Sequence, residues 1–251
     1  MTLKVLDLFS GIGGFSLGLE RAGMQTVAFC EIDPFCRTVL KKHWPDVPIY
    51  EDVRTLNGRE IAADVICGGF PCQDISAAGL GLGLEGERSG LWREYARLVS
   101  ELRPRFVIVE NVAALAYRGL LRVLGDLADI GYDAEWHCIP ASAVGAPHLR
   151  ERFWIVAYPG GVVGHRPLLS KDSTKLGGQQ AIGGEDWEFF TLVPGVPTGF
   201  GRWREMGEPG LVPEDDGLPG VLGRLRAYGN AVVPQIPEII GKAIIQAHNQ
   251  R

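Results

Sequence analysis

A cysteine and a glutamate follow two apolar runs of this 251-residue chain and could act together on one substrate. Cys72 comes directly after Pro71 and the glycine pair 68–69, and Glu110 ends a second apolar run. Pro71 restricts the backbone and the glycines leave room beside it, so the thiol is held open to a substrate, as a nucleophile must be. A single cysteine taken alone is more often an inert buried thiol. The interpretation of Cys72 therefore depends on its neighbours in the fold.

A glycine-rich loop follows the first apolar run and is the candidate ligand-binding turn. Gly11, Gly13 and Gly14 lie where a predicted strand turns into a helix, which lets backbone N–H groups approach a ligand closely. Glu31 follows about 20 residues later, the distance at which a carboxylate reaches ribose hydroxyls in doubly wound nucleotide-binding folds. A glycine cluster can also be a plain tight turn, and a dinucleotide-dependent oxidoreductase is the competing interpretation.

The residues around this loop favour S-adenosylmethionine over a dinucleotide. The loop reads G-x-G-G rather than G-x-G-x-x-G, and Asp7 directly precedes it. A carboxylate at that position would repel a pyrophosphate but suits the amino group of a methionine moiety. We therefore expect S-adenosylmethionine as the ligand.

The elements that must position these residues are those of a doubly wound α/β fold. Short apolar runs alternate with longer amphipathic stretches, as in parallel βαβ units. The predicted strands are 4–8, 26–30, 63–68, 106–110, 133–139 and 152–157. The predicted helices are 15–22, 34–43, 91–102, 120–130 and 236–248. In an open α/β sheet, ligands bind at the carboxyl ends of the strands, so the glycine loop, Cys72 and Glu110 should share one cleft.

The chain is expected to divide into three parts. Residues 1–159 would form the catalytic domain, which binds S-adenosylmethionine. From 160 the sequence becomes dense in glycine and proline and loses its apolar period, which predicts a small loop-rich domain over 160–222. Residues 223–251 would return to the catalytic domain and end in a helix.

The composition sets further bounds. The chain is 46% hydrophobic and carries a formal net charge of −5, so it can bury a full core but has no strongly basic field for nucleic acid. Its five cysteines are an odd number, and none forms a CxxC pair beside a second ligand pair, so neither a disulfide framework nor a zinc site is expected. No signal peptide or membrane-spanning run is evident. We expect a soluble, cytoplasmic protein without a metal.

At this point the residues resemble, in order, the motifs of the DNA (cytosine-5) methyltransferase family. The resemblance covers nearly all of the first 158 residues and a final stretch from about Arg224. Its motifs are the loop 7–15, Gly-Phe-Pro-Cys-Gln at 69–73, Glu-Asn-Val at 110–112, Arg-Glu-Arg at 150–152 and Gly-Asn-Ala-Val-Val-Pro at 229–234. The implied fold is a Rossmann-like S-adenosylmethionine-dependent methyltransferase fold with a small target-recognition domain.

The resemblance implies a role for each motif residue. Cys72 would attack carbon 6 of cytosine, Glu110 would share a proton with ring nitrogen 3, and Arg152, supported by Arg150, would hold the ring carbonyl. Phe9 would lie against the adenine and Asp52 would bind its amino group. The implied cofactor pocket consists of Asp7, Phe9, Gly11, Gly13, Gly14, Glu31, Ile32, Asp52, Val53, Pro71, Leu91 and Asn230. Taken alone, Asp52 reads as a solvated loop acid and the two arginines as a solvated pair.

The target carbon is inaccessible in a stacked duplex, so the cytosine must be flipped out. The glycine-rich stretch 79–90 predicts a loop that closes over the base, with Ser76 and Arg88 at DNA phosphates. Arg88 beside Glu87 could equally be a solvated charge. The segment 160–220 is shorter than is usual for recognition domains of the family, and how it is braced stays open.

The expected partner is duplex DNA and the expected product of the cofactor is S-adenosylhomocysteine. The chain is expected to be a monomer, and a cognate restriction endonuclease could accompany it. Two alternatives stay open: an RNA (tRNA) cytosine-5 methyltransferase on the same fold, and a non-catalytic module that binds S-adenosylmethionine or DNA. The joint presence of Cys72, Glu110 and Arg152 disfavours the second.

Overall fold

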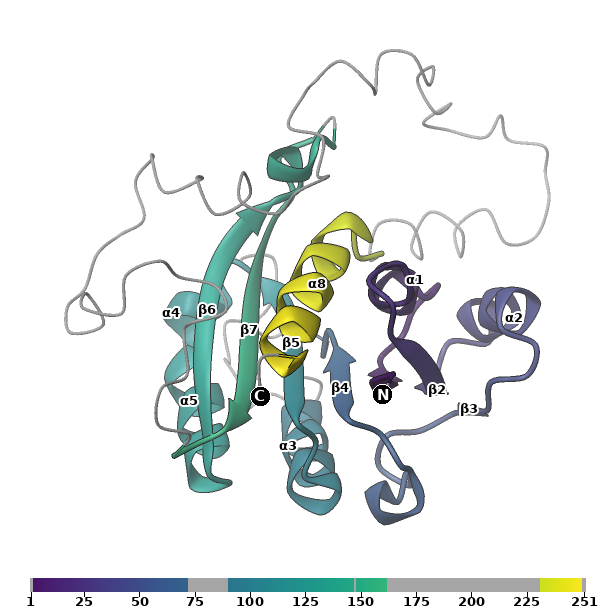
Figure 1. Cartoon of the computed structure of the whole chain (residues 1–251), viewed down its shortest axis with the longest axis horizontal. Helices are drawn as coiled ribbons and strands as arrows, with labels where there is room; N and C mark the ends of the chain where they lie inside the picture. The colour runs from purple at the N-terminus through teal and green to yellow at the C-terminus, as the bar shows by residue number, and fades with distance from the viewer. Residues whose placement is uncertain (1, 72–89, 147, 162–230, 250–251) are drawn as a thin grey trace.

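A seven-stranded sheet forms the centre of the protein in a computed structural model, which describes residues 2–71, 90–146, 148–161 and 231–249 (Figure 1). The strand order is β3-β2-β1-β4-β5-β7-β6. The strands are β1 (Lys4–Leu8), β2 (Gln25–Cys30), β3 (Ile49–Tyr50), β4 (Val65–Gly68), β5 (Phe106–Val112), β6 (Tyr132–Pro140) and β7 (Glu151–Pro159). The chain order reverses direction between β1 and β4, which creates the topological switch point where such folds bind ligands.

The strands from β3 to β5 are parallel, and β7 runs antiparallel between β5 and β6. The doubly wound α/β class is therefore confirmed, but the antiparallel β7 was not anticipated from the sequence. Its direction follows from the connection before it: the connection 141–150, which includes the short 3₁₀ helix η3 (Ala141–Val144), is shorter than the crossover of a dozen or more residues that a parallel return needs.

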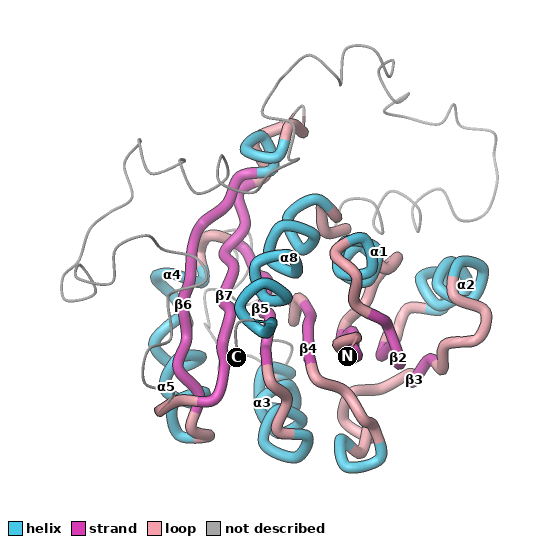
Figure 2. The backbone as a smooth tube through the Cα atoms, in the orientation of Figure 1, coloured by secondary structure: helices cyan, strands magenta, loops and turns pink. Residues whose placement is uncertain are grey.

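Helices cover both faces of the sheet (Figure 2). They are α1 (Gly14–Arg21), α2 (Pro34–His43), α3 (Leu91–Leu102), α4 (Leu115–Arg118), α5 (Leu120–Asp129) and α8 (Gln235–Asn249), with the 3₁₀ helix η1 (Gly58–Glu60) before β4. One core cluster joins α3 and α5 to one face, and a second joins α1 and α8 to the other. Alternation of inward residues along β5 serves both cores: Val107 and Val109 enter the first, and Phe106 and Ile108 enter the second.

Local sequence explains where the helices begin. Asp33 caps α2 by accepting from the backbone N–H groups of Phe35 and Cys36, and Pro34 occupies the first helical position. In α3, Trp92, Tyr95, Leu98 and Val99 recur at helical spacing and form its buried side. The predicted spans of α2 and α3 agree with the structure at both ends, α5 begins where it was predicted, and the other ends of the predicted helices differ by one residue.

The terminal helix α8 packs against α1, next to the sheet (Figure 1). Gly18 of α1 permits this contact, since an added Cβ would lie 2.2 Å from the carbonyl oxygen of Pro234. Gly241 does the same from α8, where a Cβ would lie 2.8 Å from that of Ala22. The predicted recognition domain falls almost wholly outside the described residues, so the three-part division stays a prediction. None of the described helices combines the length and apolar character needed to cross a membrane.

Candidate active site

Four neighbouring strands carry the candidate site at their carboxyl ends. The loop after β1 holds the glycines, β2 leads into Glu31, β4 leads into Gly69–Pro71, and β5 ends in Glu110, Asn111 and Val112. β2, β1, β4 and β5 are adjacent and parallel, so their carboxyl ends meet at one edge. The expected shared location is thus observed for the described residues. Cys72, Ser76, Arg88 and Asn230 lie outside them.

An ion pair joins Glu110 to Arg152 across the antiparallel strands. Arg152 opposes Val112 and Trp154 opposes Glu110, so the two charged residues are diagonal neighbours. Arg152 Nε lies 2.9 Å from Glu110 Oε1, and both side chains are mostly buried, with exposed fractions of 25% and 12%. The hydrogen-bonded neighbour strand therefore delivers the arginine to the glutamate.

Burial gives Glu110 an unusual affinity for a proton. Loss of solvation raises the pKa of its carboxyl above the usual value of 4.5, and the charges of Arg152 and Arg150 oppose that rise only in part. A carboxyl group with a raised pKa holds its proton at a higher pH than an exposed glutamate does. The charge of Arg150 thus acts on Glu110, and its expected support of Arg152 stays a prediction.

Gly69 brings the end of β4 against this carboxyl group. A Cβ at position 69 would lie 2.6 Å from Glu110 Oε2, closer than real Cβ contacts. Any side chain there would displace Glu110 or the backbone that leads to Cys72. The sequence predicted that the glycine pair leaves room beside Pro71, but not this close approach of Gly69 to Glu110.

Asn111 fixes the backbone just before the predicted nucleophile. Its side-chain Nδ2 donates to the Phe70 carbonyl at 3.0 Å, and its Oδ1 accepts from the Val112 N–H at 2.9 Å. The ring of Phe70 packs against Trp92, whose indole N–H donates to Asp126 at 2.9 Å. Pro71 and Cys72 therefore continue from an anchored residue. Asn111 stands in the Glu-Asn-Val motif, but the sequence alone does not predict this contact with Phe70.

The loop after β1 has a strained, tightly packed backbone. Phe9 adopts a left-handed conformation with φ 53°, which a non-glycine residue rarely does, and Gly11 and Gly13 have φ 54° and 87°. The Phe9 ring lies over Tyr95 of α3, with centroids 6.5 Å apart and planes at 20°. A Cβ at Gly13 would lie 2.6 Å from the ring of Trp44, so glycine is required there for packing as well as for conformation.

Glu31 ties this loop to the end of β2. Its Oε2 accepts from the Gly11 N–H and its Oε1 from the Asp33 N–H, both at 2.7 Å. Each carboxylate oxygen keeps a second lone pair, so a hydroxyl could still bind. Ile32 beside it is an exposed apolar residue, 67% accessible. The ribose contact of Glu31 stays a prediction.

Asp7 lies beneath the loop rather than at its surface. Its side chain has no exposed area, and its Oδ2 accepts from the Ser16 hydroxyl at 2.7 Å and the Ser16 N–H at 3.3 Å. Burial raises the pKa of Asp7 from 3.8 to about 8, against the lowering effect of those hydrogen bonds. In this structure Asp7 anchors the start of α1, and its contact with a methionine amino group stays a prediction.

Asp52 precedes a segment that packs against α3. Arg54 engages both oxygens of the Asp52 carboxylate, at 2.9 Å from Nε to Oδ1 and 2.6 Å from the terminal nitrogen to Oδ2. These hydrogen bonds lower the pKa of Asp52, whose side chain is 26% exposed. Val53 next to it is buried in the same core cluster as Tyr95, against which Phe9 and Leu91 pack.

Comparison with known proteins identifies the family. The model of the C-5 cytosine-specific DNA methylase family matches residues 3–175. Type II methyltransferase M2.BsuMI of Bacillus subtilis is 36% identical over 164 residues, which are 62% of this chain and 42% of that protein. Type II methyltransferase M.CviJI of a Paramecium bursaria Chlorella virus is 33% identical over 192 residues, 75% of this chain and 49% of that protein.

Solved structures show the same architecture. A DNA modification methyltransferase encoded within an Escherichia coli prophage is 32% identical with a TM-score of 0.53, over 63% of this chain and 47% of that one. Spodoptera frugiperda DNMT2 superposes with a TM-score of 0.55 at 22% identity, over 64% of this chain and 51% of that one, and supports the fold alone. The chain spans about half the length of the relatives it matches. By the family match over more than half of its residues, this chain belongs to the C-5 cytosine-specific DNA methylases.

Proposed function

We propose that the protein transfers a methyl group from S-adenosylmethionine to carbon 5 of a flipped-out cytosine in duplex DNA, through a covalent adduct on Cys72. The buried Glu110–Arg152 pair carries the proposal, because it places a carboxyl group of raised pKa and a fixed guanidinium beside Gly69, three residues before Cys72. Membership of the family supports the same reaction, and the type II names of the relatives point to DNA as the substrate.

The residues after β1 and β2, together with Asp52, fit S-adenosylmethionine. The loop after β1 leaves open space beside Gly11, Glu31 offers a carboxylate for hydroxyls, and Phe9 and Ile32 offer apolar surface for a purine. Asp52 offers an acceptor for an exocyclic amino group. When bound, the cofactor supplies an electrophilic methyl group.

The protein's own residues would then activate the base. Carbon 5 of cytosine is a poor nucleophile, so the Cys72 thiolate adds to carbon 6 while Glu110 supplies a proton to ring nitrogen 3. Arg152 binds the ring carbonyl oxygen with donors that stay charged at every working pH. Carbon 5 of the resulting enamine can then attack the methyl group of S-adenosylmethionine. Removal of the carbon 5 proton then expels Cys72 and restores aromaticity.

Methylation of DNA in a host without cytosine methylation tests this proposal. Expression of the wild-type chain should introduce 5-methylcytosine at one short sequence, read by methylation sequencing. Cys72→Ser should leave none, because the hydroxyl is a far weaker nucleophile at neutral pH. Cys138→Ser is the matched control, since this half-buried cysteine has no assigned role, and it should methylate like wild type.

The same samples separate the competing functions. If the Cys72→Ser chain methylated DNA as the wild type does, the covalent scheme would be wrong. If the purified wild type methylated transfer RNA far faster than duplex DNA, the protein would be an RNA enzyme. Absence of methyl transfer together with retained binding of S-adenosylmethionine would identify a non-catalytic module.

We also propose that residues 160–220 choose the target site. The segment interrupts the fold between the Arg-Glu-Arg and Gly-Asn motifs, and loops there could read base edges in the major groove. Exchange of this segment for that of a relative should change the methylated sequence and keep methyl transfer. A chimera that keeps the original sequence would refute this assignment.

A further inference from the structure

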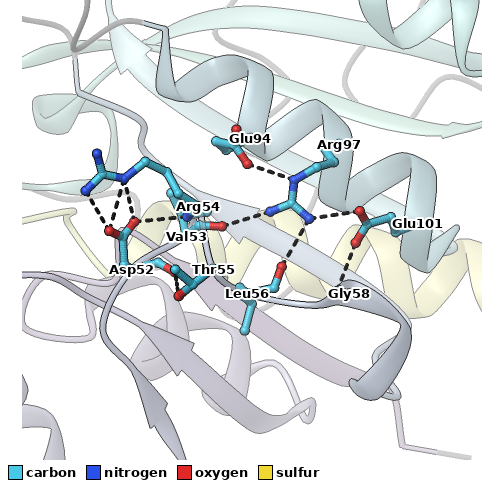
Figure 3. A network of polar contacts seen from close by, with 9 residues as sticks. All are labelled: Asp52, Val53, Arg54, Thr55, Leu56, Gly58, Glu94, Arg97 and Glu101. Atoms are coloured by element: carbon cyan, nitrogen blue, oxygen red, sulfur yellow. Dashed lines mark hydrogen bonds and ion pairs between the residues drawn. The ribbon is translucent and has the colours of Figure 1, made fainter.

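The Arg97 guanidinium of helix α3 hydrogen-bonds the segment that follows Asp52 (Figure 3). Arg97 donates to the backbone carbonyl of Val53 at 2.9 Å and to that of Leu56 at 3.1 Å. These residues lie 44 and 41 positions away in the sequence. The contacts are therefore tertiary, and they bind one helix to one loop.

Two glutamates on the same helix hold Arg97 in place. Glu94 accepts from its Nε at 2.7 Å, and Glu101 accepts from a terminal nitrogen at 2.8 Å. Such pairs along a helix contribute little to stability when exposed, and these side chains are 24–32% accessible. Their geometric effect is more specific, because with Nε and both terminal nitrogens bonded the planar guanidinium has one orientation.

Glu101 of the same helix hydrogen-bonds the other end of the segment, at Gly58. Its second carboxylate oxygen accepts from the Gly58 N–H at 3.0 Å, and a Cβ at Gly58 would lie 3.1 Å from that oxygen. The segment 53–58 is thus fixed to α3 by two carbonyls and one N–H. Asp52 is the residue directly before the first of these anchor points.

The same helix also supports the other expected adenine contact. Tyr95 of α3 lies under the ring of Phe9, and Tyr95 is two residues from Arg97. Phe9 and Asp52 come from different loops, so their separation depends on an element that touches both. α3 is that element, with Tyr95 beneath Phe9 and Arg97 behind Val53.

We propose that Arg97 is a positioning residue that sets the reach of Asp52 toward the adenine amino group and thereby makes the cofactor pocket selective for adenine. This inference rests on the proposed function. Arg97 itself touches no substrate in this assignment. It acts through the backbone of Val53 and Leu56, which are both buried side chains of the core.

Binding of two nucleosides by calorimetry tests the inference without any methyl transfer. S-adenosylhomocysteine carries the adenine amino group, and S-inosylhomocysteine has a carbonyl oxygen in its place. The wild type should bind the first about tenfold more tightly or better, since an unpaired acceptor costs about 1–3 kcal/mol. Arg97→Gln should reduce this preference to about twofold, as should Asp52→Asn.

Two further variants keep the test decisive. Arg97→Lys retains the charge and the stem but cannot reach both carbonyls, so it should fold and show an intermediate preference. Lys242→Gln removes an ion pair of the same i,i+4 type, Lys242–Glu238 in α8, and should keep the full preference. Thermal unfolding of each variant shows whether the fold is intact.

The outcomes separate this inference from the proposed function. If wild type prefers S-adenosylhomocysteine and both Arg97 variants keep that preference, the positioning role is refuted while the proposed function stands. If the Arg97 variants weaken both nucleosides by the same factor, Arg97 supports the pocket as a whole and the selectivity assignment is refuted. If wild type binds neither nucleoside, the proposed function fails and the inference fails with it.

Discussion

Two regions each pair an arginine with a carboxylate: the edge of the sheet with Glu110 and Arg152, and the segment 52–58 beside α3, called here the adenine-side segment. The pKa of the carboxyl group shifts in opposite directions in the two regions. Glu110 and Arg152 meet in a mostly buried place, and burial raises the pKa of Glu110 despite the arginine. Asp52 and Arg54 meet at the surface, and the arginine lowers the pKa of Asp52. The difference teaches that solvent access, rather than pairing, decides whether the pKa of a carboxyl group is raised or lowered.

Replacement of the buried acid should have the largest effect. Glu110→Gln keeps the shape and a hydrogen bond but cannot share a proton with the base, so turnover should fall on the order of 10²-fold or more. Affinity for S-adenosylhomocysteine should be unchanged. Steady-state methylation and calorimetry measure the two. A variant that loses only cofactor affinity would mean that Glu110 binds the cofactor rather than the target base.

A methyl group at position 69 should have the next largest effect. Gly69→Ala puts a Cβ 2.6 Å from Glu110 Oε2, so the carboxyl group or the end of β4 must shift. We expect roughly a tenfold or greater loss of turnover, since a misplacement of about 1 Å can cost as much as 10²-fold. Gly125→Ala is a matched control, because an added Cβ there meets no atom within 4 Å. Equal turnover of the two alanine variants would remove the argument for close approach.

Glu110 and Asp52 should also make the free energy of unfolding depend on pH in opposite directions. The folded pKa of Glu110 is raised, so its contribution is fully present below the unfolded pKa of 4.5 and is lost as pH rises through the folded pKa. The folded pKa of Asp52 is lowered, so its contribution is present above 3.8 and is lost as pH falls. The contribution of each group to the free energy of unfolding changes by at most about 1.4 kcal/mol per pH unit.

Chemical denaturation of the wild type, Glu110→Gln and Asp52→Asn at several pH values measures these slopes. As pH rises from about 4.5, Glu110→Gln should gain stability relative to wild type. As pH falls below about 4, Asp52→Asn should gain relative to wild type. Parallel curves for all three proteins would contradict the contrast between buried and exposed pairs.

Loss of the exposed arginine should have the smallest effect. Arg54 has a side chain that is 63% accessible, so Arg54→Gln should change the free energy of unfolding by less than about 1 kcal/mol. Thermal or urea unfolding at neutral pH measures it. A much larger loss would mean that the adenine-side segment depends on Arg54 as well as on Arg97.

The sequence predicted the layered fold because its apolar runs are buried on both faces and α2 carries a clear start signal. β1 and α2 illustrate this: the apolar Val5, Leu6 and Leu8 of β1 are all buried, and α2 begins with Asp33 and Pro34. The direction of β7 could not be predicted from its own residues, because an apolar run has the same pattern in either direction. The length of the connection before it held the missing information.

The sequence also indicated that Glu110 and Arg152 belong to one site, but not the contacts that hold the site together. Glu110 and Arg152 carry chemistry that their residue types announce. Three supporting residues, Gly69, Asn111 and Arg97, contact residues far away in the sequence. These contacts form only after the strands and α3 are packed. Such supporting residues cannot be read from one sequence unless a motif happens to include them.

Trapping of the covalent adduct tests the central claim most directly. A duplex that carries the methylated sequence with 5-fluorocytosine at the target cannot lose a proton from carbon 5 after methyl transfer, so the enzyme should stay attached to it. Peptide mass spectrometry should then find the DNA on Cys72, and Cys72→Ser should form no adduct while Cys138→Ser forms it as wild type does. An adduct on another residue, or methylated product released by Cys72→Ser from an ordinary duplex, would contradict the account.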